Sequence, residues 1–264
     1  DLLKEGKSFE EIKKELTLKP VAEDLSEILG MDVDFIDGCT DIEIPKDNDV
    51  VLLENLRFHA EEEENDEGFA KKLASLADAY VNDAFGASHR EHASVFAITK
   101  FLPSCAGFLV EKEVKELSKL LNPERPFIAI VAGAKEDKIG ALKEFTKKAD
   151  KILIAGVLAN TFLKAKGVDI GSSKFDEETF NAAKELIELA GKKLVLPVDF
   201  VTADKFDSSA NIQIVSIDKI PKEWVAMDIG PQTIQNYKDE VKDAKTIFWA
   251  GPLGVFEMEK FSAG

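Results

Sequence analysis

The sequence predicts an α/β protein of two domains, each with a parallel sheet covered by helices on both faces. Short apolar runs alternate with amphipathic segments from Leu52 onward, which is typical of strands joined by crossover helices. A charged helix over Glu111–Leu121 separates two such series. A length of 264 residues suits two domains of ordinary size. We therefore expect a domain over residues 1–110, a hinge helix over 111–122 and a domain over 123–264.

The elements of the first series rest on local patterns. Ser8 and Glu11 have the spacing of a capping box that begins a helix. Asn122 and Pro123 end the charged helix. The acidic run 61–64 is interpreted as a solvated loop. The other predicted elements are a buried strand over Val50–Leu53, an amphipathic helix over Asp66–Leu76 and a second strand over Ala79–Val81.

The second series alternates more regularly. Apolar strands separated by helices favour one parallel sheet. The predicted strands are Phe127–Val131, Lys151–Ala155, Lys193–Leu196, Ile212–Val215 and Thr246–Trp249, with helices near Lys138–Lys148, Leu158–Lys166 and Asp176–Ala190.

Composition excludes several classes of function. The net charge of −16, without a basic stripe, argues against nucleic acid as a partner. No apolar run approaches the roughly 18 residues of a membrane span, and no basic-then-apolar leader is visible. Cys39 and Cys105 lack a partner at metal-binding spacing, so we expect two buried thiols in a reducing cytoplasm and no metal ligands.

Arginine and histidine are scarce and clustered. Of three arginines and three histidines, Arg57 and His59 form one cluster, and His89, Arg90 and His92 form another. The planar guanidinium suits bidentate contact with phosphate or carboxylate, which predicts a small-anion site formed by both arginines. The alternative is an Arg–carboxylate pair that fixes a loop.

Glycine-bearing turns follow several predicted strands of the second series. In an open parallel sheet, ligands bind beyond the carboxyl ends of the strands, and glycine lets the backbone approach them closely. Helix N-termini offer free amides to phosphate, and Lys135 and Lys138 would neutralise charge there. The turns predict a nucleotide-sized crevice; they are 132–138, 155–162, 228–233 and 250–257.

These motifs, in this order, resemble the phosphoglycerate kinase family. The matching segments are LLENLRF, VNDAFG followed by HREHAS, FLPS-AG, GAK-DKI, LPVDFVTADKF, DIGP and WAGPLGVFE. The match begins near Leu18 and covers roughly the middle two-thirds of the family pattern. It implies two Rossmann-like three-layer α/β/α domains, a phosphoglycerate-binding one and a nucleotide-binding one, that close about a hinge.

The resemblance also implies a reaction and a set of roles. The reaction is phosphoryl transfer between 1,3-bisphosphoglycerate and ADP, giving 3-phosphoglycerate and ATP with Mg²⁺. Such transfer needs mainly positioning and charge neutralisation. The implied roles are glycerate contacts for Arg57 and Arg90 with His89 beside them, contact with the transferring phosphoryl group for Lys135, ribose contact for Glu257, and further nucleotide contacts for Ala134, Lys138, Gly156, Gly230 and Pro252.

The sequence departs from the family pattern in ways that leave an alternative open. Segments at both ends of the pattern are absent, and the nucleotide turns carry Ala132, Val157 and Ala250 where the family has smaller or more polar residues. A non-catalytic fold that at most binds an anion is therefore the alternative to a kinase. Absent elements leave sheet edges uncovered, so we also expect an oligomer or a complementing chain. An unrelated dehydrogenase-like domain is disfavoured because the GxGxxG pattern is lacking.

Overall fold

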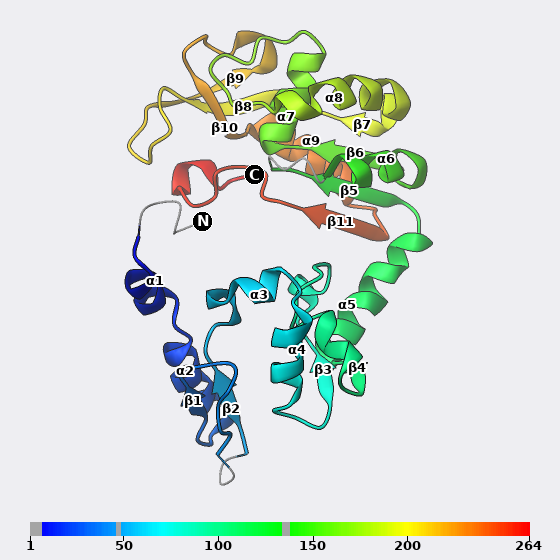
Figure 1. Ribbon diagram of the computed structural model, residues 1–264. Coiled ribbons are helices and arrows are strands. Elements are labelled where there is room, and N and C mark those ends of the chain that lie inside the picture. Colours follow the sequence, from blue (N-terminus) through cyan, green and yellow to red (C-terminus); the bar gives the residue numbers. More distant parts are fainter. Residues whose placement is uncertain (1–6, 46–48, 134–137) are drawn as a thin grey trace. The chain divides into compact units, whose positions relative to one another are not determined.

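The computed structural model describes residues 7–45, 49–133 and 138–264. The chain divides into two compact units, residues 1–118 (unit 1) and 119–264 (unit 2), coloured blue to green and green to red in Figure 1. The helix predicted over Glu111–Leu121 corresponds to α5 (Phe108–Ser118), followed by a 3₁₀ turn at Lys119–Leu121, and its role as a hinge stays a prediction. Within the described residues, no helix has the length and apolar character needed to cross a membrane.

Unit 2 is built on a parallel sheet. In the described part of the chain its strand order is β11-β5-β6-β7, and every pairing is parallel. The predicted bounds of β5 and α6 are confirmed. Its strands and helices are β5 (Phe127–Val131), α6 (Lys138–Lys148), β6 (Lys151–Ile154), α7 (Gly156–Ala165), α8 (Glu177–Ala190), β7 (Leu194–Val195), β8 (Asp199–Ala203), β9 (Ile212–Ser216), β10 (Val225–Ile229), α9 (Pro231–Val241) and β11 (Thr246–Ala250).

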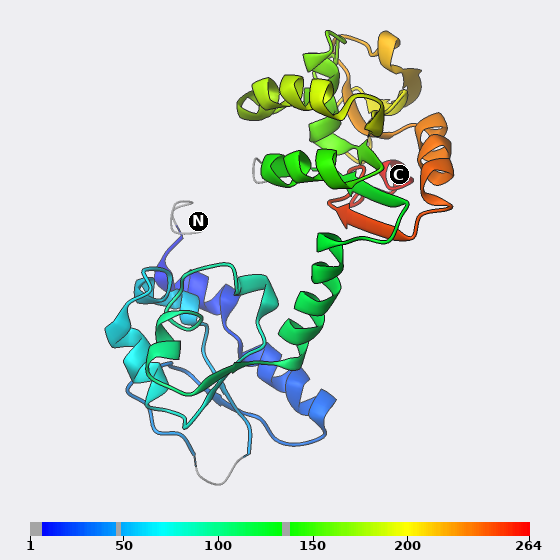
Figure 2. The ribbon, with the colours of Figure 1, turned by 90° about the vertical axis from the view of Figure 1, so that its right-hand side faces the viewer.

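The helices pack on this sheet through one large apolar core. All five residues of β5 are buried, as a central parallel strand requires. Helices α6 and α8 lie side by side (Figure 2), and the core joins side chains of α6, α7 and α8 to the strands. Tyr237 of α9 enters the same core, and its hydroxyl donates to the carbonyl of Ile154 at 2.6 Å. These contacts give the expected Rossmann-like α/β arrangement.

A second sheet of unit 2 corrects one prediction. Ile212–Val215 was expected in the parallel sheet, but β9 pairs antiparallel with β8, which also pairs antiparallel with β10. The connections explain the difference. Only residues 196–198 separate β7 from β8, and an eight-residue loop, 204–211, joins β8 to β9. A parallel crossover needs a dozen or more residues, so connections this short cannot return a strand in parallel.

Unit 1 holds shorter strands in two separate pairs. Within the described residues, β1 pairs with β2 and β3 pairs with β4, both in parallel (Figure 1). Its elements are α1 (Phe9–Leu16), α2 (Lys19–Leu29), β1 (Asp34–Ile36), β2 (Val51–Leu53), α3 (Ala60–Glu63), α4 (Glu67–Ala74), β3 (Tyr80–Asn82), β4 (Ser104–Ala106) and α5. The predicted capping box at Ser8 and Glu11 is confirmed.

The core of unit 1 is small. Phe69 and Leu73 of α4 pack with Ile98, the buried Cys39 and several alanines. Cys105 of β4 is exposed, so the expectation of two buried thiols is wrong for this residue. The acidic run 61–64 is not a loop, because α3 includes most of it and Glu62 is only 2% exposed. The solvated-loop interpretation is therefore wrong for Glu62, whose carboxylate finds hydrogen-bond donors inside the unit.

Candidate functional site

A cavity of about 220 Å³ lies in unit 2, where several strands end. Gly133 follows β5, Gly156 follows β6, Asp228 belongs to β10, and the turn 252–255 follows β11. This is the edge at which an open parallel sheet binds ligands. The rest of the lining is mostly apolar and comes largely from the antiparallel sheet and its loops; it includes Val157, Phe200, Phe206, Val225, Met227 and Leu253.

Two glycine turns touch each other at this cavity. Gly156 has a φ of +62°, a conformation that L side chains rarely adopt. A Cβ on Gly156 would lie 2.9 Å from the amide nitrogen of Gly133. The amide of Leu158 then donates to the carbonyl of Gly133 at 3.0 Å, which fixes the start of α7 against the turn after β5. Glycine is therefore required at 156 by both conformation and space.

Asp228 is the buried carboxylate among the residues that line the cavity. Its carboxylate accepts hydrogen bonds from the backbone amides of Ile229, Ala263 and Gly264 at 2.8–3.0 Å. Burial raises the pKa of this carboxyl above its usual value, against the opposing effect of those amides. A Cβ on Gly254 would lie 2.2 Å from Asp228 Oδ1, so this glycine makes room for the carboxylate. Asp228 thus connects β10 with the turn at Gly254 and with residues 263–264.

Asn160 is a buried polar residue in the wall of the cavity. It is 3% exposed, and its Nδ2 donates to the carbonyl of Lys174 at 3.0 Å. Its Oδ1 has no hydrogen-bond partner among the described residues, although Asn160 lines the cavity. Buried polar atoms normally have partners. The largely apolar lining of the cavity suits a flat heteroaromatic ring.

The cavity includes some of the predicted nucleotide residues. Gly156 and Pro252 line it, whereas Gly230 and Glu257 do not. Ala134 and Lys135 lie outside the described residues, and Lys138 is the first residue of α6.

Gly230 lies beside a buried carboxylate. Asp199 accepts from the amides of Gln232 and Thr233 at 3.0 and 2.8 Å, so it already satisfies the N-terminus of α9. A Cβ on Gly230 would come within 2.3 Å of Asp199. This packing accounts for the glycine by itself.

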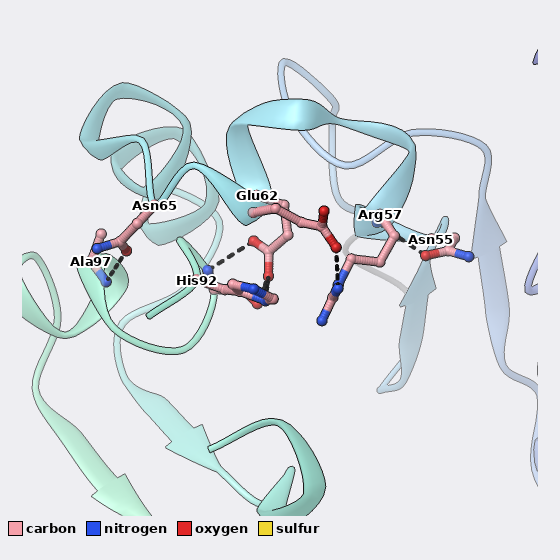
Figure 3. Close-up of polar contacts among 8 residues, drawn as sticks. Asn55, Arg57, Glu62, Asn65, His92 and Ala97 are labelled. Atoms are coloured by element: carbon pink, nitrogen blue, oxygen red, sulfur yellow. Dashed lines mark hydrogen bonds and ion pairs between the residues drawn. The ribbon is translucent and has the colours of Figure 1, made fainter. Parts of the chain in front are cut away.

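In unit 1, Arg57 is held by its own segment (Figure 3). Its Nη1 lies 2.5 Å from Glu63 Oε1, and its backbone amide donates to Asn55 Oδ1 at 3.0 Å. The Arg–carboxylate pair expected as the alternative to an anion site is therefore present. It is an exposed pair, and such pairs contribute about 0–1 kcal/mol, so a phosphate would compete for this guanidinium at little cost.

Glu62 ties the Arg57 segment to the segment that carries the second cluster. Its carboxylate accepts from the amide and hydroxyl of Ser94 at 2.9 and 2.6 Å, and its carbonyl accepts from the amide of Ala93 at 2.9 Å. His92 Nδ1 lies 4.0 Å from Glu62 Oε1, too far for a hydrogen bond (Figure 3). The role of Glu62 was not predicted from the sequence, because nothing in a run of four acidic residues indicates which one is buried.

Among the described residues, Arg57 and Arg90 do not line the same groove of unit 1. Arg57 lines a groove of about 620 Å³ in unit 1, which Arg90 and His89 do not line. Arg90 and His89 are exposed. The backbone of Arg90 is fixed by its amide, which donates to Ala87, and by its carbonyl, which accepts from His92, both at 3.0 Å. The joint anion site therefore stays a prediction.

The fold and cavity define a two-unit α/β protein with a Rossmann-like ligand site at the carboxyl edge of its larger sheet. The comparisons with known proteins give the family. The family model "Phosphoglycerate kinase" matches residues 4–264, and the chain belongs to the phosphoglycerate kinase family.

Relatives and solved structures agree with this assignment. The chain is 48% identical to the phosphoglycerate kinase of Moorella thermoacetica and 49% identical to that of Synechococcus sp.. Both alignments cover 98% of this chain; they cover 69% of the Moorella protein and 67% of the Synechococcus protein. Solved phosphoglycerate kinases from Coxiella burnetii and Pyrococcus horikoshii match with TM-scores of 0.76 and 0.84 at 38% and 31% identity. These alignments cover 95% and 94% of this chain and 66% and 67% of theirs. The chain thus spans about two-thirds of the length of these proteins.

Proposed function

We propose that this chain takes part in phosphoryl transfer between 1,3-bisphosphoglycerate and ADP, the glycolytic reaction that forms 3-phosphoglycerate and ATP, in the cytoplasm. The observation that carries the proposal is the cavity of unit 2, where glycine turns after β5, β6 and β11 converge. Its largely apolar walls support a nucleotide base as its occupant.

The nucleotide phosphates would extend from this cavity toward the turn after β5. The close contact of Gly133 and Gly156 keeps side chains away from that path. Lys135 and Lys138 are proposed to neutralise phosphate charge, and Glu257 to accept from the ribose hydroxyls. The transfer requires groups held in line rather than a covalent intermediate on the protein.

The Mg²⁺ is proposed to enter with the nucleotide. The described residues contain no group of three His, Cys, Asp or Glu side chains that could hold a metal ion. Mg²⁺ commonly keeps several waters and binds through substrate phosphates, which suits such a site. When bound, it would neutralise charge on the phosphate oxygens, while the lysines of the turn orient the nucleotide.

The glycerate side would use the arginine clusters. Arg57 would release Glu63 and turn its guanidinium to the substrate phosphate, and Arg90 with His89 would approach from the segment that Glu62 anchors. Replacing either arginine by lysine removes a bidentate contact, so we expect binding of 3-phosphoglycerate to weaken by roughly tenfold.

The alternative is a chain that binds nucleotide or anion without useful turnover. Two observations favour it: Arg57 pairs with Glu63 and lines a groove that Arg90 does not, and Val157 places a side chain in the cavity lining. A misplacement of about 1 Å of the reacting groups costs about 100-fold in rate. We therefore expect slow turnover from the 264-residue chain.

Calorimetry tests whether the chain binds its proposed ligands, and a coupled assay tests whether it turns them over. Titration with MgADP should show saturable binding, and the Gly156→Ala variant should bind more weakly because its Cβ meets the turn at Gly133. The Gly140→Ala variant is the matched control, since open space surrounds that position.

Turnover of ATP and 3-phosphoglycerate at the 1–100 s⁻¹ typical of kinases would contradict the non-catalytic alternative. The proposal itself fails if neither MgADP nor 3-phosphoglycerate binds.

A further inference from the structure

Lys174 is the cationic residue among the described residues that line the cavity of unit 2. The other charged residue of this lining is Asp228, whose carboxylate already accepts hydrogen bonds from three backbone amides. By contrast, no described residue forms a hydrogen bond or an ion pair with the ammonium group of Lys174, which is an exposed residue. A donor at the mouth of an apolar cavity can discriminate among the ligands that enter it.

The backbone of Lys174 is held to two walls of the cavity. Its carbonyl accepts a hydrogen bond from Nδ2 of the buried Asn160 of α7 at 3.0 Å. The hydroxyl of the preceding residue, Ser173, accepts from the amide of Ala226 in β10 at 2.9 Å. The loop that carries Lys174 is therefore bonded to both α7 and β10, and each of these elements contributes residues to the lining.

The position of Lys174 along α7 places it near the base of the nucleotide and away from the phosphates. The proposed path of the phosphates begins where Gly156 meets Gly133, at the N-terminus of α7. Asn160 follows Gly156 by four residues of this helix, which is roughly 6 Å at 1.5 Å per residue. Lys174, which Asn160 holds, thus lies about one helical turn from the anion-binding end, on the side where Ala226 lines the cavity.

We propose that Lys174 selects the base of the nucleotide and makes the cavity prefer a 6-oxopurine, as in inosine or guanosine diphosphate, over adenine. This inference rests on the proposed nucleotide site. An ammonium group only donates hydrogen bonds. A 6-oxopurine offers it the neighbouring acceptors O6 and N7, whereas adenine offers N7 beside an amino group that is itself a donor. Adenine therefore binds more weakly, because a donor of the base faces a donor of the protein.

The remaining lining is compatible with this role. The stem of a lysine packs along apolar surface while its ammonium group stays in water, and Val157 and Val225 supply apolar surface at the cavity. The flexible stem lets the ammonium group follow O6 or N7. The carboxylate of Asp228 is buried and already hydrogen-bonded, so it does not supply an acceptor that would favour the amino group of adenine.

Isothermal titration calorimetry with MgADP and with magnesium inosine diphosphate (MgIDP) tests the proposal. The two nucleotides differ only in the 6-substituent and the N1 proton that accompanies it, so the ratio of their Kd values isolates the edge of the base. Lys174→Met removes the ammonium group and keeps an apolar stem, whereas Lys174→Arg keeps a cationic donor. Lys166→Met is the matched control, because Lys166 is also an exposed lysine but does not line the cavity.

We expect the unaltered chain to bind MgIDP at least about fivefold more tightly than MgADP, which is the lower end of the discrimination that a contact with a base edge provides. Lys174→Met should bring the ratio of the two Kd values close to one, because it removes the donor that distinguishes the bases. Lys174→Arg and Lys166→Met should both retain the ratio of the unaltered chain.

Several results would overturn the inference. If neither nucleotide binds, the proposed nucleotide site is wrong and the inference is wrong with it. Binding of both nucleotides with equal Kd values would leave the site in place and remove only the selectivity. A ratio that persists in Lys174→Met would assign the selection to another group. An equal loss of affinity for both nucleotides in Lys174→Met, with the ratio unchanged, would place the ammonium group at the phosphates instead of the base.

Discussion

The two units bury their apolar side chains to very different extents. In unit 2, one core joins the parallel sheet to helices α6, α7, α8 and α9, and β5 is buried along its whole length. In unit 1, a small core lies under α4, and the two strand pairs border an open apolar groove. The difference shows that strands buried along their whole length occur in unit 2, whereas none of the described strands of unit 1 has a buried residue.

The largest effect should come from matched core substitutions in the two units. Leu163 of α7 is 1% exposed inside the large core, and Leu73 of α4 is 7% exposed and also lines the groove. Leu163→Ala should cost about 4 kcal/mol, because the surrounding core cannot collapse into the cavity. Leu73→Ala should cost about 2 kcal/mol, because its open side has few contacts to lose.

Urea unfolding measures both effects. Both tryptophans of the chain, Trp224 and Trp249, lie in unit 2, so their fluorescence reports that unit. Hydrogen exchange of α4 reports unit 1. Equal losses of unfolding free energy in the two leucine variants would show that both cores enclose the substituted side chain equally well.

The second-largest effect on stability should come from Asp199, whose carboxylate accepts hydrogen bonds at the N-terminus of α9. Asp199 accepts from the amides of Gln232 and Thr233 and from the hydroxyl of Thr233 at 2.6–3.0 Å. Asp199→Ala leaves these buried donors unpaired and should destabilise unit 2 by about 3 kcal/mol. Asp176→Ala at the N-terminus of α8 removes one such bond and should cost about 1 kcal/mol. Thermal unfolding of both variants checks this order, and a reversed order would contradict it.

The third prediction concerns the contact between the glycine turns. Gly156→Ala places a Cβ at positive φ and 2.9 Å from Gly133, so unit 2 should lose about 2 kcal/mol. Gly140→Ala, inside α6 with open space around it, should gain about 0.5–1 kcal/mol from helix propensity. Denaturant midpoints of the two variants should therefore move in opposite directions. A shift in the same direction would mean that position 156 relaxes freely.

The smallest effect depends on pH and belongs to unit 1. Burial raises the pKa of Glu54, but the amides of Leu18 and Asn55 and the hydroxyl of Thr17 outweigh it, so the pKa lies below the usual 4.5. A carboxyl with a lowered pKa stabilises the fold above its unfolded pKa, and this stabilisation is lost as pH falls through the folded one. Glu54→Gln should thus cost about 1 kcal/mol at pH 7 and progressively less below pH 4.5. A cost that is constant from pH 7 to pH 3 would exclude ionisation as its origin.

Local patterns predicted the elements with strong periodicity. The predicted ranges of β5 and α6 agree with the structure, because a continuous apolar run and an amphipathic helix are local signals. β8 and β10 were missed. They pair antiparallel through contacts distant in sequence, as Val225 opposite Ala203 illustrates, and no local pattern encodes that pairing.

Only part of the candidate site was predicted, because local patterns locate the ends of strands but not the contacts between segments distant in sequence. Gly156 and Pro252 follow strands, so the strand-end rule located them beside the cavity. Phe200 and Met227 form its apolar walls from the antiparallel sheet and were not foreseen. Glu62 looked like its acidic neighbours, and only the fold brings Ser94 to its carboxylate.

Hydrogen exchange with and without MgADP tests most directly whether unit 2 is the closed ligand-binding unit. The proposed site predicts slower exchange in the segments that line the cavity, 156–160, 225–228 and 252–255, and unchanged exchange at the groove strands of unit 1, 51–53 and 80–82. Slower exchange at the groove strands, with none at the cavity, would contradict the assignment of the nucleotide to unit 2.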